Sequence, residues 1–292
     1  MVNIPRAING VVSTFLILST VCVALRVYTR RFLVKKLHIS DYLIVLTQIF
    51  TVCEAAYIFL GVKGGIGNAS FEPTPDNIVA ALRNQLIIEL FFVVAITFLR
   101  ISIGLQLWAL VKLQNVSSQK KIYSSIQRIL IIGVVAIMSI YGIVWFFVLL
   151  FQCTPVHFFW TRALGDVDGT CLSNDVQAGV AYSHSGLSAL SDFIMGLLPV
   201  WILWSVNMPL RTKITVAGLL AVGASFFGDP VSIILCSFIE LALGIIATCI
   251  ATLRPLYLKS TNRQRTTLGG TSGTHDEKLT ATHDAPKASV EV

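Results

Sequence analysis

Seven apolar runs, separated by short polar segments, divide the chain between residues 8 and 253. From the N-terminus they cover residues 8–25, 42–62, 87–111, 129–151, 183–206, 214–227 and 231–253. A helix needs about 20 predominantly apolar residues to cross roughly 30 Å of hydrocarbon, and most of these runs approach that length. We therefore expect an all-α membrane protein with a seven-transmembrane-helix bundle in residues 1–258. Residues 259–292 are rich in Thr, Ser and Gly without an apolar period, so we expect a disordered cytoplasmic tail.

Two of the runs depart from the ordinary pattern. The first follows a basic residue, as a secretory signal does, but its apolar stretch is longer than the roughly 7–15 residues of such signals. The sixth holds only 14 residues, or about 21 Å of helix. If it crosses, this helix is unusually short and the bilayer thins locally. If the sixth run does not cross the membrane, the basic tail lies outside, against the distribution of Lys and Arg. We therefore favour a crossing. A deletion in the chain would also explain why this run is short.

The composition excludes a soluble fold. Hydrophobic residues make up 55% of the chain and charged residues 13%, with a mean hydropathy of +0.77. An average soluble domain has about 25% charged residues. The remaining charge is too small to cover a soluble globule of 292 residues.

Lys and Arg are divided unequally between the two sets of alternating polar segments. The N-terminal segment and the connections on its side hold four of them, the opposite connections and the tail hold 17, and Arg100 lies inside a run. Because short loops rich in Lys and Arg stay in the cytoplasm, we expect the N-terminus outside and the C-terminus in the cytoplasm. The net charge of +7 is then a topology signal, and we expect no nucleic-acid partner.

The outer segments carry two candidate modification sites. Cys153 and Cys171 lie in the fourth connection, on the oxidising side of the membrane, and we expect a disulfide there, with two free thiols as the alternative. Asn68 begins an N-glycosylation acceptor sequence in the second connection, whereas the same pattern at Asn115 faces the cytoplasm and is expected to stay unmodified. His157 and His184 lie on the outer side with these cysteines, which could suggest a metal site, but the spacing fits no zinc pattern and we expect no metal.

Four ionisable residues lie deep inside the apolar runs and form the candidate site: Glu54, Arg100, Asp192 and Glu240. Counting residues from the run ends places the three acids about 12–14 Å below the outer boundary and the Arg about 20 Å below it. Charges at this depth are costly and are functional candidates. One guanidinium cannot neutralise three carboxylates, so we expect at least one of them to be protonated at neutral pH. The alternatives are a structural polar lock and an outward-facing pocket that binds a ligand or relays protons.

Several motifs occur in a characteristic order at the ends of the runs. They are Arg26-Val27-Tyr28-Thr29-Arg30, Asp41-Tyr42, Gly65-Ile66-Gly67, Arg100-Ile101-Ser102-Ile103, Cys153-Thr154-Pro155 with Trp160 and Cys171, Asp192 with Leu198-Pro199, Met208-Pro209-Leu210-Arg211, and Glu240 with Leu243-Gly244-Ile245 and Leu253-Arg254-Pro255. In this order the chain resembles the fungal rhodopsin-like integral membrane proteins, a family that includes the satratoxin-cluster membrane proteins and the seven-helix part of surface-sensing receptor-like proteins. The chain departs from the family at Ser40, which replaces an acid, and at Arg100, which replaces a Lys.

The resemblance implies a receptor-like protein, or an accessory protein of a secondary-metabolite pathway, in the plasma membrane or an endomembrane. An unidentified small-molecule ligand would enter from outside, and the basic inner loops would face a cytoplasmic signalling partner. We expect no cofactor, because retinal needs a Lys in the seventh run and residues 231–253 contain none. The alternatives are an intramembrane pathway enzyme, such as an acid-initiated cyclase, and a small-molecule transporter, although no inverted repeat is visible. On balance we do not expect an enzyme.

Overall fold

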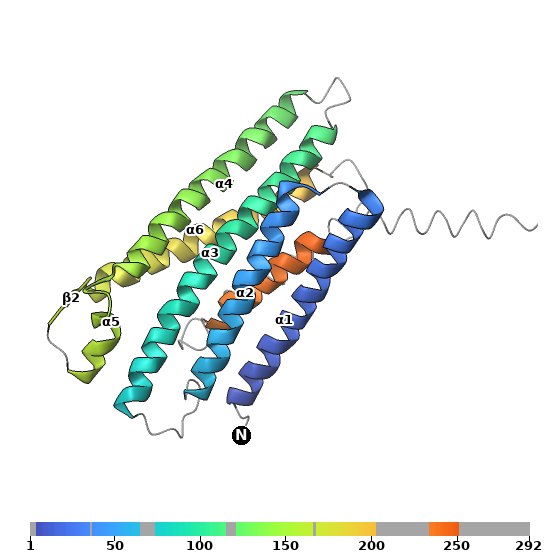
Figure 1. Ribbon diagram of the computed structural model, residues 1–292. Coiled ribbons are helices and arrows are strands. Elements are labelled where there is room, and N and C mark those ends of the chain that lie inside the picture. Colours follow the sequence, from blue (N-terminus) through green and yellow to red (C-terminus); the bar gives the residue numbers. More distant parts are fainter. Residues whose placement is uncertain are drawn as a thin grey trace, which may run out of the picture. The chain divides into compact units, whose positions relative to one another are not determined.

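A computed structural model describes residues 4–35, 37–64, 74–114, 121–165, 168–202 and 234–250 (Figure 1). The long elements are α1 (Ile4–Tyr28), which continues as the π-helical η1 (Thr29–Val34), α2 (Ile39–Lys63), α3 (Pro75–Gln114), α4 (Lys121–Leu150), α6 (Asn174–Ile202) and the unlabelled helix Ile234–Ile250. Between α4 and α6 lie β1 (Cys153–Thr154), α5 (Phe158–Thr161), η3 (Arg162–Leu164) and β2 (Thr170–Cys171), and the two strands pair antiparallel.

Within the described residues, four helical segments are long and apolar enough to cross a membrane: Pro5–Leu33, Ile39–Lys63, Pro75–Ala109 and Ser125–Leu150. The helix Ile234–Ile250 is apolar but shorter. The prediction of an all-α membrane bundle is thereby confirmed. The expected short sixth helix (214–227), the tail (259–292) and Asn68 lie outside the described residues.

Hydroxyl side chains inside these helices bond to their own backbone. The Oγ1 atoms of Thr47, Thr51 and Thr97 donate to the carbonyl oxygens four residues earlier, at 2.9, 2.9 and 2.7 Å. Hydrocarbon offers no hydrogen-bond partners, so a polar group within it must be satisfied by the protein. These Thr residues are therefore compatible with a transmembrane helix.

The helix α3 is the centre of the bundle. At one end, its Ile88 packs with Ile8 of α1, Ile58 of α2 and Phe238. Towards its other end, different residues of α3 pack against α1, α2 and the helix Ile234–Ile250 in one cluster and against α4 and α6 in another. The approach to α4 is close at Gly104, where a Cβ atom would collide with the side chain of Val135.

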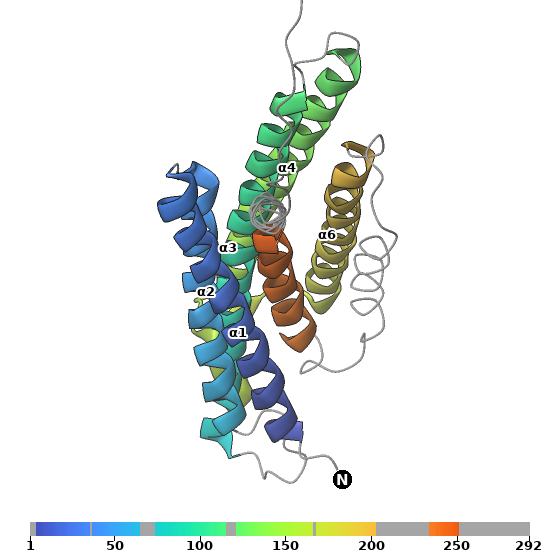
Figure 2. The same ribbon diagram turned by 90° about the vertical axis from the view of Figure 1, so that its right-hand side faces the viewer.

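The helices α6 and Ile234–Ile250 run in the same direction. The start of α6 lies beside the end of α4, where Gln177 bonds to Gln152, and its Met195 packs near the C-terminal end of α3. Phe238 packs at the N-terminal end of α1, whereas Cys249 packs near the other end. Figure 2 shows α6 on one side of the helix Ile234–Ile250 and α1 on the other. Ile202 and Ile234 therefore lie at opposite ends of the bundle.

One face of α4 is apolar and exposed. Seven of its described large apolar side chains are more than half exposed, namely Ile129, Ile132, Ile137, Ile140, Ile143, Val144 and Phe147. Most of them are three or four residues from another member of the set, so they share one broad side of the helix. In water such a face would be an unfavourable patch, but in a bilayer it contacts lipid.

Candidate functional site

The Arg100 guanidinium joins three helices inside the bundle. Arg100 on α3 is 5% exposed. Its Nη2 donates to both carboxylate oxygens of Asp192 on α6 at 3.2 Å, its Nε donates to Oδ1 at 3.3 Å, and Nη2 also donates to Ser188 Oγ. A second acid, Glu240 on the helix Ile234–Ile250, lies 3.8 Å from Nη2. One cation thus has a short contact with one acid and a longer contact with another.

The partners on α6 continue along the helix as a polar face. Ser188 and Asp192 are four residues apart and therefore neighbours on one side of α6, and His184 precedes them by the same interval. The His184 ring is buried and stacks between Tyr141 and Trp145 of α4, with ring centroids 5.7 and 5.3 Å away. This face of α6 thus lies between α3 and α4 and aligns the acid with Arg100.

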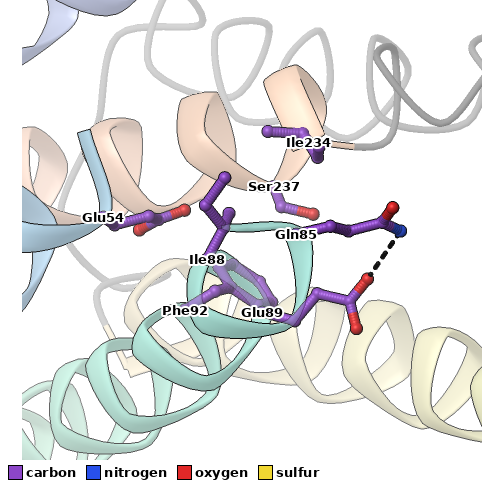
Figure 3. A pocket seen from close by; sticks show the side chains of 7 residues that line it. All are labelled: Glu54, Gln85, Ile88, Glu89, Phe92, Ile234 and Ser237. Atoms are coloured by element: carbon purple, nitrogen blue, oxygen red, sulfur yellow. Dashed lines mark hydrogen bonds between the residues drawn. The ribbon is translucent and has the colours of Figure 1, made fainter. Parts of the chain in front are cut away.

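The fourth predicted member of this cluster, Glu54, lies elsewhere. It is fully buried on α2 and lines a separate cavity with Gln85 and Glu89 of α3 and Ser237 (Figure 3). Among the described residues, neither of its carboxylate oxygens has a hydrogen-bond partner. The structure therefore divides the four predicted residues into an Arg100 ion set, which contains Asp192 and Glu240, and an isolated buried acid.

A second ion pair, which the sequence interpretation missed, lies at the end of α1. Arg26 is 0% exposed, and its Nη2 and Nε donate to Asp41 Oδ1 of α2 at 2.7 and 2.9 Å. Its Nη1 donates to the Thr248 carbonyl oxygen at 3.0 Å. With the side-chain amide of Gln106 in the orientation that satisfies its neighbours, its oxygen accepts from both terminal nitrogens of Arg26. This guanidinium thus connects α1, α2, α3 and the helix Ile234–Ile250.

The count of basic residues in the connections treats Arg26 only as a charge that orients the chain, and the buried ion pair adds a second role. A carboxylate near the first turn of the next helix was the available signal: Asp41 Oδ2 accepts from the backbone N–H of His38, the residue before α2, at 3.0 Å. Acids are favoured at this position because they satisfy free N–H groups at a helix start. An acid that also faces the preceding helix is a natural partner for a basic residue there.

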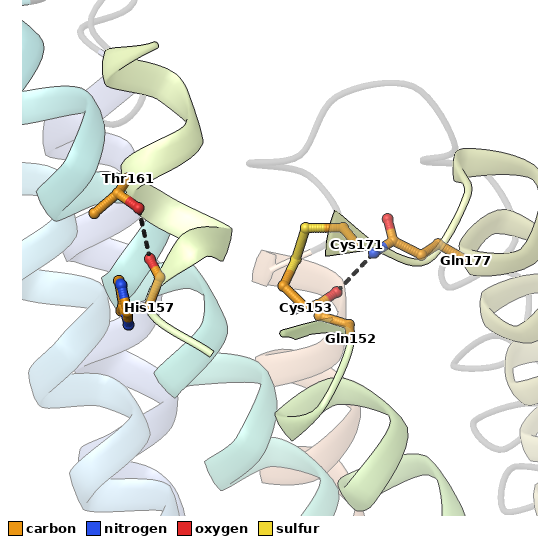
Figure 4. The surroundings of a disulfide bond; sticks show 6 residues. All are labelled: Gln152, Cys153, His157, Thr161, Cys171 and Gln177. Carbon is orange, nitrogen blue, oxygen red and sulfur yellow. Dashed lines mark hydrogen bonds between the residues drawn. A yellow bond between two sulfur atoms is a disulfide. The ribbon is translucent and has the colours of Figure 1, made fainter. Parts of the chain in front are cut away.

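The connection between α4 and α6 contains the expected disulfide. Cys153 and Cys171 are bonded and face each other in the pairing of β1 with β2 (Figure 4). The backbone N–H of Leu172 donates to the Gln152 carbonyl oxygen at 2.9 Å, and the Gln177 amide donates to the Gln152 side chain at 3.1 Å. These contacts fix the start of α6 against the end of α4.

The two histidines of the metal hypothesis lie apart. His157 is in the segment before α5 and is exposed, whereas His184 is buried in α6. Within the described ranges, no three or more His, Cys, Asp or Glu residues form a group that could hold a metal ion.

Together these features define an integral membrane helix bundle with ionisable residues inside it. The chain belongs to the fungal rhodopsin family, because the model of the fungal rhodopsin domain matches residues 25–234, more than half of the chain. It is also similar to the satratoxin biosynthesis SC1 cluster protein 4 of Stachybotrys chartarum, with 32% identity over 99 residues. That similarity spans 34% of this chain and 34% of the relative, so the chain covers about a third of the relative's length. No solved structure matches the chain.

Proposed function

We propose that this protein is a receptor-like or accessory membrane protein of a secondary-metabolite pathway. The observation that carries the proposal is the unequal sharing of Arg100 between Asp192 on α6 and Glu240 on another helix. A cation with two alternative acids provides two pairings, and a small movement of one helix relative to the other exchanges them. Such an element suits a protein that changes between two arrangements when a ligand binds.

The link to a metabolite pathway is supported by the similarity to a protein named for satratoxin biosynthesis. Because that similarity covers about a third of each chain, the pathway role belongs to the proposal. Residues 231–253 contain no Lys to form a Schiff base with retinal, so the family membership does not imply light-driven activity.

The orientation is also part of the proposal. The disulfide lies where α4 ends and α6 begins, whereas Arg26, Arg30 and Arg31 lie at the other end of the bundle, where α1 ends. A disulfide favours an oxidising compartment and basic residues favour the cytoplasm. We therefore place the disulfide end outside, in the plasma membrane or an endomembrane, with the basic end available to a cytoplasmic partner.

Deletion of the gene in its native host tests the role. Metabolites inside and outside the cell and transcripts across the pathway are measured together. We expect transcription to fall across a pathway, which indicates sensing, whereas lost product with precursor accumulated inside would indicate catalysis. Trapped product would indicate export, and an unchanged profile would contradict a pathway role.

Complementation connects the result to the ion set. Wild-type protein should restore transcription, whereas Asp192→Asn should not, because it removes the charge that holds Arg100. Asp175→Asn is the matched control, since Asp175 is exposed in the first turn of the same helix. Equal amounts of the three proteins in the membrane must be verified by immunoblot, and full restoration by Asp192→Asn would refute the proposed switch.

A further inference from the structure

A partly open cavity of about 170 Å³ lies between α2, α3 and the helix Ile234–Ile250. Its polar lining consists of Glu54, Gln85, Glu89 and Ser237. Figure 3 shows the Glu54 carboxylate directed toward Ser237, and the Gln85–Glu89 pair at the other end of the cavity. The Gln85 amide donates to Glu89 Oε1 at 3.2 Å.

The remaining lining is apolar and includes Ile88, Phe92 and Ile234. An apolar cavity of about 150 Å³ can hold a benzene molecule. The cavity therefore has room for a small organic body as well as for a polar group. An aromatic ring such as that of Phe92 also attracts cations over its face.

The missing hydrogen bonds of Glu54 point to a ligand independently of the number of acids in the lining. Its side chain is completely buried, lines the cavity, and has no hydrogen-bond partner for either oxygen among the described residues. Buried polar groups in proteins are almost always hydrogen-bonded, and an exception needs an explanation. A ligand that donates hydrogen bonds to this carboxyl group would supply the missing partner.

The chemistry of the lining selects the charge of that ligand. The lining residues contain two carboxyl groups, one amide and one hydroxyl group, but no Lys, Arg or His. Arg100 is not available, since it is bonded to Asp192 and Ser188. As far as the described residues line it, the cavity is thus rich in acceptors and lacks a resident cation.

We propose that this cavity binds a protonated amine with a small apolar body, its ammonium group bonded to Glu54 and its body against Ile88 and Phe92. The inference deepens the proposed function, because it names the ligand class of a receptor-like protein. The apolar wall favours an organic ammonium over a sodium ion, which would need oxygen ligands on all sides.

Isothermal titration calorimetry on the full chain in lipid nanodiscs tests this proposal, with empty nanodiscs as the blank. The probe is benzylammonium chloride at pH 7, and benzyl alcohol is the neutral probe of similar shape. We expect saturable binding of benzylammonium and none of benzyl alcohol. Equal binding of the two probes would overturn the proposal, as would the same heat from sodium chloride alone.

Variants locate the binding. Glu54→Gln keeps the shape of the side chain but removes the charge, and we expect benzylammonium affinity to fall about 10- to 100-fold. Ser237→Leu fills the cavity without changing either acid, and we expect this variant to lose benzylammonium binding. Asp175→Asn removes an exposed carboxylate outside the cavity at the same end of the bundle, and this variant should bind benzylammonium like the wild type. Wild-type affinity in both cavity variants would refute the assignment.

The two proposals fail separately. If gene deletion lowers pathway transcription while benzylammonium does not bind, the receptor role remains and the ligand class is wrong. If benzylammonium binds through Glu54 while deletion leaves transcripts and metabolites unchanged, the site is correct and the pathway role is wrong.

Discussion

Replacing Arg26 by Gln tests how much the buried ion pair at the end of α1 stabilises the bundle. Besides its contacts with Gln106, Arg26 makes two hydrogen bonds to Asp41 and one to the Thr248 carbonyl oxygen. At roughly 0.6 kcal/mol for an average interhelical hydrogen bond in a membrane protein, the loss of these three bonds alone would cost about 2 kcal/mol. The substitution also leaves the Asp41 side chain, which is 1% exposed, without its main partner. Breaking a buried pair in this way costs about 3–5 kcal/mol, so we expect the larger loss.

Arg30→Gln is the matched control for this experiment. Arg30 approaches the same oxygen of Asp41, but at 3.8 Å and with 23% of its side chain exposed. A long contact made by a partly exposed Arg contributes less, about 0–1 kcal/mol as in surface ion pairs. The two substitutions thus remove the same group from the same acid and differ chiefly in burial.

The free energy of unfolding is measured by titrating the purified proteins with dodecyl sulfate in mixed micelles, followed by tryptophan fluorescence. We expect Arg26→Gln to lose at least 3 kcal/mol, and Arg30→Gln less than about 1 kcal/mol. A loss near 2 kcal/mol for Arg26→Gln would indicate that only its hydrogen bonds matter. Equal losses for the two variants would refute the reasoning from burial.

Three further predictions concern other parts of the bundle. Gly104→Ala should destabilise the protein by about 1–3 kcal/mol, because the added Cβ atom collides with Val135 of α4. Gly133→Ala, where a Cβ atom meets open space, should be neutral or stabilising. The same dodecyl sulfate titration compares the two variants, and equal losses would contradict the close approach of α3 to α4. Cys153→Ser should lower the free energy of unfolding by about 3 kcal/mol, because it opens the loop that the disulfide closes across a sequence separation of 18. Wild-type protein kept in reductant should unfold like the variant. Identical unfolding of oxidised and reduced wild-type protein would contradict this prediction. Asn68→Gln should remove an endoglycosidase-sensitive mobility step on gels while Asn115→Gln changes nothing, and the opposite result would reverse the proposed orientation.

The apolar runs predicted where most helices lie, but not where they begin. The run 42–62 corresponds closely to α2 (Ile39–Lys63). In contrast, α3 begins at Pro75 although its run begins at residue 87, and α6 begins at Asn174 although its run begins at residue 183. The N-terminal turns of these helices contain polar residues, such as Asp76 and Arg83 in α3 and Asp175 and Gln177 in α6, and extend beyond the apolar run. Hydropathy registers contact with hydrocarbon, whereas helix length depends on backbone hydrogen bonding, so the two need not end together.

The buried pair of Arg26 and Asp41 shows a second limit of sequence patterns. A basic residue at the end of an apolar run is expected whether it faces water or a partner within the bundle. Only the packing of the helices distinguishes these cases, and it places Arg26 within contact of Asp41 and the Thr248 carbonyl oxygen. Residue counting along the chain contains no information about such long-range neighbours.

The sequence pattern predicts one site for Glu54 and Arg100 because it does not show where the helices begin. Glu54 shares its cavity with Ile88, which precedes Arg100 by 12 residues on α3. At 1.5 Å per residue, Ile88 and Arg100 lie about 18 Å apart along the axis of α3. Depths counted from the ends of the runs predict a separation of only about 6–8 Å between Glu54 and Arg100, because the run 87–111 begins 12 residues after the start of α3. Glu54 and Asp192 therefore belong to different sites, and substitutions of these two acids should be interpreted as independent perturbations.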